Sequence, residues 1–276
     1  MEFHFVKASP CRNTTVFVED NVSVFVRARL ARYLMNDEVL AAEQVGFLVP
    51  PLSEVSALRV EMAGDEFCGN ASLALGALAV MRGLRATGTP FFVECSGSES
   101  PLRVSAESVA PGRWRGTVEL SPKARILEIK LSSAGVTYHG AIVELPGICH
   151  FCIESEPFSQ ETYDALLKQL TKHIVSDAYG IIPYRENGNK EFSICPYVAV
   201  PAAKSFVFEQ ACGSGSFALG LWLARIRGLT QLDVLQSGGT IHVEIGERSS
   251  ISEEVYFPCA GKFFADEILL RDASGK

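Results

Sequence analysis

The chain has 276 residues, 47% of them hydrophobic, which is enough for one large or two ordinary domains with a sizeable core. Its net charge of −7 and the absence of a basic run argue against nucleic acid as a partner, because phosphate contacts need clustered Lys and Arg. No apolar run reaches the roughly 18 residues of a membrane helix, so no membrane partner is expected. The first residues also lack the basic start and apolar stretch of a secretory signal. These features predict a cytoplasmic location, in which the eight cysteines stay mostly reduced.

Residues 1–124 predict a sheet around one buried helix. Alternating or β-rich segments at 2–9, 16–20, 43–49, 55–64, 90–97, 102–107 and 113–121 are typical of strands. Residues 22–44 look helical in their second half, with Leu30, Leu34 and Leu40 at roughly helical spacing. From Ala71 to Met81 apolar residues fall on every side, as expected of a helix that is buried all round. We therefore expect the flanking strands to curl about this helix.

The same pattern restarts near residue 125. Strands are expected at 124–133, 138–147, 150–156, 192–200 and 203–210, followed by a strand, a Gly-Gly turn and a strand at 232–246. Residues 159–174 form the clearest amphipathic pattern in the chain, with Ser159 as a candidate N-cap. A second helix that is apolar on all sides runs from Phe217 to Ile226. The fold class is therefore α+β, with two pseudo-symmetric lobes at 1–124 and 125–258, each a curled, mainly antiparallel sheet around a central helix.

A short motif stands at the start of each all-round-apolar helix. The first reads Cys68-Gly69-Asn70-Ala71-Ser72 and the second Cys212-Gly213-Ser214-Gly215-Ser216. A cysteine at a helix N-terminus lies among unpaired backbone N–H groups at the positive end of the dipole, and both favour the thiolate. The same N–H groups can hold a carboxylate. Two such sites, one on each face of an α-carbon, could remove a proton from one side and return one to the other.

Other readings of these residues stay open. Free cysteine is among the most buried residue types, so each motif could serve only to start a helix. Glu43 and Glu209 could orient a substrate amine, assist proton transfer or be structural carboxylates. Asn13 lies in an expected turn, whose geometry Asn tolerates. Cys149 and Cys152 have the spacing of a redox or zinc pair, but no second pair exists, and no metal site is predicted.

These motifs resemble the diaminopimelate epimerase superfamily, whose members are amino-acid racemases and epimerases that need no pyridoxal phosphate. The resemblance runs from Asn13 to the segment "PCAGKFFADEI" and so covers nearly the whole chain. It implies Cys68 and Cys212 as the catalytic residues and no cofactor. It also implies that residues 259–276 form a closing strand that returns to the first lobe. The substrate-binding residues that follow from the motifs and the resemblance are Asn13, Gln44, Gly69, Asn70, Asn189, Glu209, Gly213 and Ser214, with Glu43 as a further orienting candidate.

Departures from the family pattern bear on the substrate. An asparagine that holds the far end of a diamino acid is replaced by Ile148, and an arginine expected before the second cysteine is missing beside Gln210. The stretches "EQVGFL", "GDEFCGNAS", "FEQACGSGS" and "SGGTI" are similar to histidine racemases of staphylopine-type metallophore pathways. This resemblance implies conversion of L-histidine to D-histidine. The alternatives are a diaminopimelate epimerase, a racemase of another amino acid, or a non-enzymatic amino-acid-binding or thiol redox protein. The expected partner is a small amino acid, and a homodimer is an allowed assembly.

Overall fold

The computed structural model describes residues 1–201 and 205–265, and within them the chain folds into two compact units. Unit 1 consists of Met1–Val118 with the described residues from Glu253 onward, and unit 2 is Glu119–Ser252. The lobe boundaries expected from the sequence lie at residues 124 and 258. Residues 266–276 of the expected closing strand lie outside the described part of the chain.

Eight strands of unit 1 pair in a closed ring, counted over the described residues. Strand β1 pairs with β17 and β2, and the series continues through β3, β4, β5 and β6 to β7, which pairs with β17 again. The pairs are antiparallel except for β2–β3 and β4–β5 among those whose register is determined. The bounds are β1 Glu2–Pro10, β2 Thr15–Val18, β3 Gln44–Val49, β4 Ser56–Met62, β5 Phe91–Cys95, β6 Leu102–Ala110, β7 Arg113–Leu120 and β17 Ser249–Phe264.

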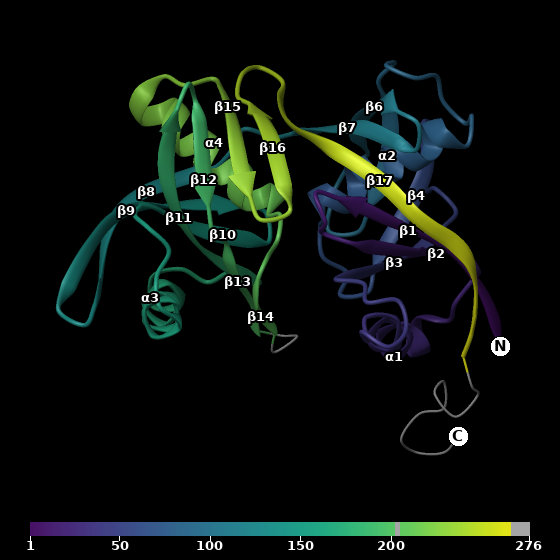
Figure 1. Ribbon diagram of the computed structural model, residues 1–276, viewed down its shortest axis with the longest axis horizontal. Coiled ribbons are helices and arrows are strands. Elements are labelled where there is room, and N and C mark those ends of the chain that lie inside the picture. The colour runs from purple at the N-terminus through teal and green to yellow at the C-terminus, as the bar shows by residue number, and fades with distance from the viewer. Residues whose placement is uncertain (202–204, 266–276) are drawn as a thin grey trace. The chain divides into compact units, whose positions relative to one another are not determined.

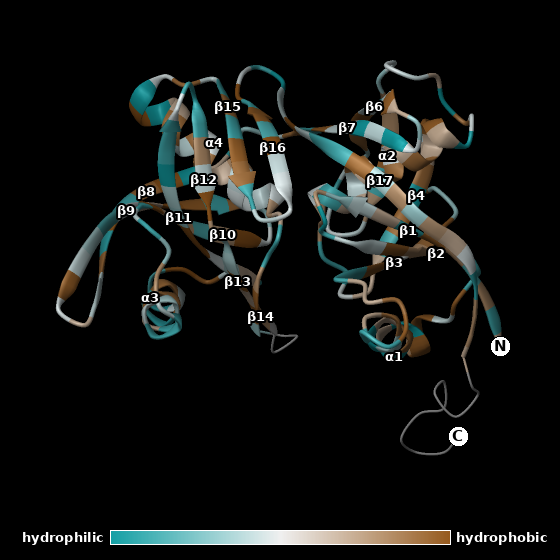
Figure 2. Cartoon of the chain, in the orientation of Figure 1, coloured by the Kyte–Doolittle hydropathy of each residue, from teal (hydrophilic) through white to brown (hydrophobic). Residues whose placement is uncertain are grey.

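The ring encloses α2 (Gly69–Met81), as Figure 1 shows. Every residue of this helix from Asn70 to Val80 is buried, because the strands cover all of its sides. Helix α1 (Val24–Leu34) lies outside the ring and buries one side, formed by Leu30, Ala31 and Leu34, in a cluster with β1, β2 and β3. In Figure 2 α1 accordingly shows both hydrophilic and hydrophobic segments. Leu40, expected on this helix, lies beyond its end in a turn.

Unit 2 builds a sheet on the same plan around α4 (Gly213–Arg227). The neighbouring pairs β8–β9, β9–β10, β11–β12, β11–β13, β13–β14, β15–β16 and β16–β17 are antiparallel, whereas β10–β11 and β12–β15 are parallel. The bounds are β8 Arg125–Ser133, β9 Val136–Leu145, β10 Ile148–Glu154, β11 Ala178–Gly188, β12 Glu191–Ile194, β13 Tyr197–Val200, β14 Ser205–Phe208, β15 Gln231–Gln236 and β16 Gly239–Glu244. Helix α4 packs against β9, β10, β11, β15 and β16.

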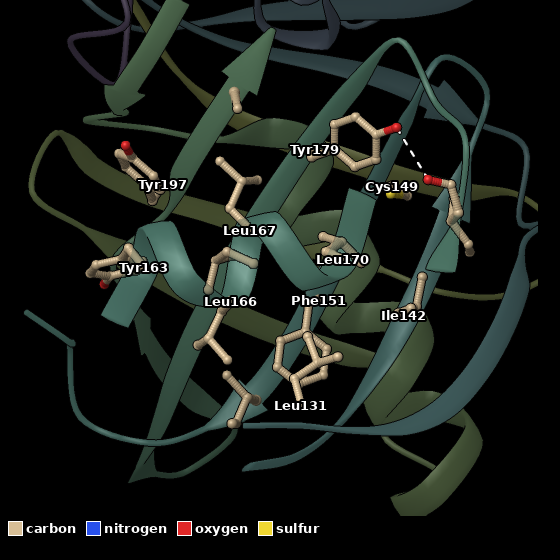
Figure 3. Close-up of a cluster of buried hydrophobic side chains, with 14 residues drawn as sticks. Leu131, Ile142, Cys149, Phe151, Tyr163, Leu166, Leu167, Leu170, Tyr179 and Tyr197 are labelled. Atoms are coloured by element: carbon tan, nitrogen blue, oxygen red, sulfur yellow. Dashed lines mark hydrogen bonds between the residues drawn. The ribbon is translucent and has the colours of Figure 1, made fainter. Parts of the chain in front are cut away.

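Strand β10 separates two packed layers in unit 2. Its odd residues Cys149, Phe151 and Ile153 belong to the cluster that buries the apolar side of α3 (Gln160–His173) (Figure 3). Since side chains alternate along a strand, His150 and Cys152 face the other way, and α4 packs against β10. The α+β class with two sheet-wrapped central helices is thus confirmed, and β10 places a buried histidine in the layer of α4.

Candidate active site

Helix α2 begins at Cys68, which acts as its N-cap. The backbone of Cys68 is extended (φ −132°, ψ 109°), and its sulfur accepts a hydrogen bond from the N–H of Ala71 at 3.3 Å. The hydroxyl of Ser72 donates to the Cys68 carbonyl at 2.7 Å. A sulfur thus takes the place that an oxygen usually fills at an N-cap. Gly69 and Asn70 occupy the first helical positions, where backbone N–H groups lie at the positive end of the helix dipole.

The Cys68 thiol contacts the start of β3, which in turn contacts the turn after β1. This thiol donates to the side-chain Oε1 of Gln44 at 2.9 Å, which connects the helix to the start of β3. The backbone N–H groups of Glu43 and Gln44 both donate to the carbonyl of Thr14 at 3.0 Å. The turn that contains Asn13, only 2% exposed, therefore adjoins the strand that carries Gln44. We call Asn13, Glu43, Gln44 and residues 68–70 the Cys68 cluster.

Cys212 begins α4 with nearly the same geometry. Its backbone is extended (φ −110°, ψ 100°), its sulfur accepts from the N–H of Gly215 at 3.3 Å, and the hydroxyl of Ser216 donates to its carbonyl at 2.8 Å. A Cβ at Gly215 would lie 3.0 Å from the Cys212 sulfur and 2.9 Å from Ile182 Cδ1. The glycine therefore lets its own N–H approach the thiol closely. The N–H groups of Gly213 and Ser214 have no partner within the helix.

Gln236, at the end of β15, ties this helix start to the sheet. Its Oε1 accepts from the backbone N–H of Cys212 at 2.6 Å, and its Nε2 donates to the hydroxyl of Ser216 at 3.0 Å. The carbonyl of Gln210 also accepts from the N–H of Gly238 at 2.8 Å, so the Gly-Gly turn after β15 packs on the segment before Cys212. These bonds fix the position of the Cys212 backbone.

The pKa of the Cys212 thiol is raised well above its usual value of 9.0. Burial is the main cause, since the side chain is buried with 2% of the residue exposed, and the nearby Glu209 carboxylate adds to it. Hydrogen bonds from Ser214 and the Gly215 N–H act in the opposite direction but are outweighed. The helix start thus favours the thiolate, as expected from the sequence, but burial and Glu209 raise the pKa of Cys212 by more.

His150 completes the group around Cys212. Its Nε2 lies 2.9 Å from the hydroxyl oxygen of Ser214, which in turn lies 3.6 Å from the Cys212 sulfur. The imidazole is fully buried, and this burial lowers its pKa to about 3, so the ring is neutral at physiological pH. We call His150, Glu209, Cys212, Gly213, Ser214, Gly215 and Gln236 the Cys212 cluster.

Of the other site residues expected from the sequence, Asn189 stands apart. It lies in the exposed turn between β11 and β12 with a left-handed backbone (φ 52°), and within residues 1–201 and 205–265 its side chain makes no hydrogen bond. Sequence reasoning did not assign a role at this site to His150 or Gln236. Each is far from the Cys212 helix start in the sequence and reaches it only in the folded chain. No local sequence pattern therefore indicates its role.

The cysteine pair on β10 does not form a ligand pair. Cys149 packs in the α3 cluster, whereas Cys152, three positions on, faces the opposite side of the strand. Among the described residues no three His, Cys, Asp or Glu side chains are grouped as a metal would require. In the same part of the chain, no helix is both long and apolar enough to span a bilayer.

The fold is shared with enzymes that act at a carbon stereocentre. A hydroxyproline epimerase from Agrobacterium vitis, solved with bound trans-4-hydroxy-L-proline, matches 99% of this chain and 94% of its own with a TM-score of 0.71 at 11% sequence identity. This likeness shows that the chain has the fold of that epimerase.

Sequence comparison identifies the protein family. Residues 2–260 match the family model described as the histidine racemase CntK N-terminal domain, and the chain therefore belongs to this family. A histidine racemase of Fusobacterium nucleatum is 26% identical over 239 residues, which cover 85% of this chain and 86% of that protein. A histidine racemase of Staphylococcus aureus is 23% identical over 277 residues, covering 95% and 97%. The protein is accordingly an isomerase of the racemase type.

Proposed function

We propose that this chain racemises histidine without a cofactor, using Cys68 and Cys212 as an acid and base pair. The observation that carries the proposal is the recurrence of one arrangement in the two units. In each, a cysteine caps a buried helix, accepts an N–H from the third residue along, and has its carbonyl bound by the serine four residues along. Reacting thiols need fixed positions, and these contacts supply them.

In the proposed reaction the α-proton changes faces in two steps. The thiolate of one cysteine takes the α-proton, and the electron pair of the broken C–H bond stays on the α-carbon and its carboxylate. The thiol of the other cysteine then gives its proton to the opposite face. After one turnover the protonation states of the two cysteines are exchanged, so the reverse reaction regenerates the starting enzyme. No oxidant, reductant or leaving group is required.

The substrate carboxylate is assigned to the helix starts. The N–H groups of Gly69 and Asn70, and those of Gly213 and Ser214, point out of their helices at the positive ends of the dipoles. An anion there would also stabilise the negative charge that develops when the α-proton leaves. Asn13, Gln44 and Asn189 are proposed as further substrate contacts. Glu209 is proposed to hold the substrate amine or to accept the Cys212 proton, and Glu43 to orient the substrate amine or assist proton transfer.

Histidine as substrate is supported by the names of the sequence relatives and by the residues at two positions. Both sequence relatives described above are histidine racemases. Ile148, at the start of β10, and Gln210 supply no charge for the far end of a diamino acid. Diaminopimelate is therefore the less favoured substrate, and it belongs in the same assay.

The proposal is tested by incubating the protein with a panel of L-amino acids that includes histidine and diaminopimelate in D2O. We expect D-histidine to appear and deuterium to enter the α-position. The variant with both Cys68→Ser and Cys212→Ser should keep the circular dichroism spectrum and lose racemisation. Racemisation that persists in this double variant would overturn the two-cysteine mechanism. Conversion of another amino acid faster than histidine would overturn only the substrate assignment.

A thiol redox role makes a different prediction. The eight cysteines are free thiols in the structure. If Cys68 and Cys212 acted as a redox pair, counting of free thiols after mild oxidation would show the loss of both, and the protein would carry out no racemisation in reductant. We expect racemisation to require reductant instead.

Cytoplasmic location and homodimer formation also remain proposals. The reduced cysteines support the first, because disulfides are rare in that compartment. Cell fractionation and sedimentation at several protein concentrations test the two separately.

A further inference from the structure

His150 is a fully buried polar side chain that the proposed proton transfer does not use. It lies in the middle of β10, between β9 and β11, with Gly180 opposite it in the parallel register. A Cβ on Gly180 would lie 2.1 Å from His150 Nδ1, so the absence of a side chain there makes room for the ring. Burying an imidazole costs stability unless its polar atoms are paired. An apolar side chain in place of His150 could fill the same space without that cost. The presence of His150 therefore calls for an explanation.

The two ring nitrogens have different surroundings. Nε2 lies 2.9 Å from the hydroxyl oxygen of Ser214, whereas Nδ1 has no hydrogen-bond partner among the described residues and lies against the Gly180 backbone. The neutral ring carries one proton, and a buried N–H without an acceptor is rarer and costlier than a bare lone pair. The geometry therefore favours the tautomer with the proton on Nε2 and the lone pair on Nδ1.

This tautomer sets the direction of the Ser214 hydroxyl. When Nε2–H donates to the hydroxyl oxygen, the proton of that hydroxyl is left to point elsewhere, and the Cys212 sulfur lies 3.6 Å away, within reach for the large sulfur atom. The sulfur also accepts the N–H of Gly215 at 3.3 Å. Both bonds favour the thiolate, whereas burial, the largest cause, and the Glu209 carboxylate oppose it.

We propose that His150 is a positioning residue that turns the Ser214 hydroxyl into a proton donor toward Cys212, and so stabilises the thiolate that Cys212 becomes after it has given up its proton. The proposal rests on the assignment of Cys212 as a reacting thiol. It concerns the tautomer and the thiol chemistry, which can be measured without substrate. Its failure is therefore distinguishable from failure of the racemase proposal.

The tautomer is read directly by NMR of protein labelled with ¹⁵N in histidine, between pH 6 and 8. We expect the His150 resonances, assigned by comparison with His150→Gln, to show a protonated Nε2 and an unprotonated Nδ1 throughout this range. A ring protonated on Nδ1 would overturn the proposal, because Ser214 would then donate to His150 rather than to Cys212.

The effect on the thiol is read from alkylation of the native protein by iodoacetamide between pH 6 and 10, followed by peptide mass spectrometry. The Cys68 peptide in the same sample is the internal control. Access of the reagent to buried Cys212 affects its absolute rate, but the pH at which that rate rises reports the thiolate.

Three variants separate positioning from packing. Ser214→Ala removes the donor, His150→Leu removes the group that orients it, and His150→Gln keeps an N–H donor near the place of Nε2. We expect the first two to slow Cys212 alkylation at neutral pH roughly tenfold, which corresponds to a rise of one pKa unit. We expect His150→Gln to stay near the parent protein and Cys68 to be unchanged in all three.

An unchanged Cys212 profile in Ser214→Ala would overturn the proposal. So would equal slowing in His150→Leu and His150→Gln, because the imidazole would then act through packing alone. Ser214 is half-buried in the first turn of α4, where alanine is a good helix former, so this variant decides the question even if His150→Leu does not fold.

Discussion

The two helix starts, one in each unit, share a backbone plan and differ in what surrounds the thiol. Cys68 is 9% exposed and donates its proton to a neutral acceptor, the Oε1 of Gln44. Cys212 is 2% exposed and lies near a carboxylate, Glu209, with the Ser214 hydroxyl and His150 behind it. The caps fix the sulfur positions in the same way in both units. The side chains around each thiol differ between the units, and they set the pKa of that thiol. The comparison therefore predicts that the two thiols have unequal roles.

The largest effect is expected from removing either thiol. Cys68→Ser and Cys212→Ser should each lower the racemisation rate by roughly 10²–10⁴-fold, the usual contribution of one acid or base group. If each thiol serves one face of the α-carbon, the remaining thiol can still exchange the proton on its own face. The two variants should therefore incorporate deuterium from D2O into opposite enantiomers of histidine. Exchange of the same enantiomer by both variants would contradict the assignment of one thiol to each face, and the double variant provides the blank.

The next effect concerns stability against pH, for which the two units should behave in opposite ways. In unit 1 burial raises the pKa of Glu253 from 4.5 to about 8, although the nearby Cys11 thiol acts in the opposite direction. The native state therefore keeps a proton that the unfolded chain releases above pH 4.5, and unit 1 should lose stability as the pH rises from 4.5 to 8. In unit 2 the pKa of His150 falls from 6.5 to about 3, so that unit should lose stability as the pH falls below 6.5.

The two tryptophans allow each unit to be observed separately. Trp114 lies in unit 1 and Trp222 in unit 2, so Trp222→Phe and Trp114→Phe each leave one reporter. Urea unfolding from pH 5 to 9 in these backgrounds gives both profiles. Glu253→Gln should remove the decline in the Trp114 signal, a change on the order of a few kcal/mol, and should leave the Trp222 profile unchanged. A decline that survives in Glu253→Gln would mean that another group titrates.

The sequence was sufficient to predict the parts of this comparison that depend on local pattern. Helices that are apolar on all sides must be enclosed, so α2 and α4 and the strands around them could be expected, and the Cys-Gly motifs marked where the helices start. The sequence was not sufficient to predict which side chains surround the two thiols. His150 reaches Ser214 across 64 positions of the chain, and Gln236 reaches Cys212 across 24, from strands whose side chains look like ordinary core. The helix start favours the Cys212 thiolate as expected, but no local pattern shows that burial and Glu209 raise the pKa of this thiol more than the helix start lowers it.

The backbone N–H of the two cysteines offers a smaller contrast. In unit 2 this group donates to Gln236 Oε1, whereas in unit 1 the N–H of Cys68 lies near the sulfur of Cys95 at the end of β5, which is a weaker acceptor than an amide oxygen. Gln236→Leu leaves a buried donor unpaired and should lower the free energy of unfolding by about 1–3 kcal/mol. Cys95→Ala should lower the free energy of unfolding by less through the loss of its interaction with the Cys68 N–H. Urea unfolding, followed at Trp222 for Gln236→Leu and at Trp114 for Cys95→Ala, compares the two losses. Equal losses of unfolding free energy would show that packing, rather than the partner of the N–H, sets the effect.

The smallest expected effect sharpens the role of Glu209. Its carboxylate raises the pKa of the Cys212 thiol, so Glu209→Gln should lower that pKa and speed alkylation of Cys212 at neutral pH by about tenfold, while Cys68 stays unchanged. Glu247→Gln, at an exposed site of the same unit, makes the same change of net charge and should have no effect. The kinetics then separate the two proposed roles. If Glu209 exchanges a proton with Cys212, its loss lowers kcat and shifts the pH profile. If it only holds the substrate amine, its loss raises KM and leaves the pH profile of kcat in place.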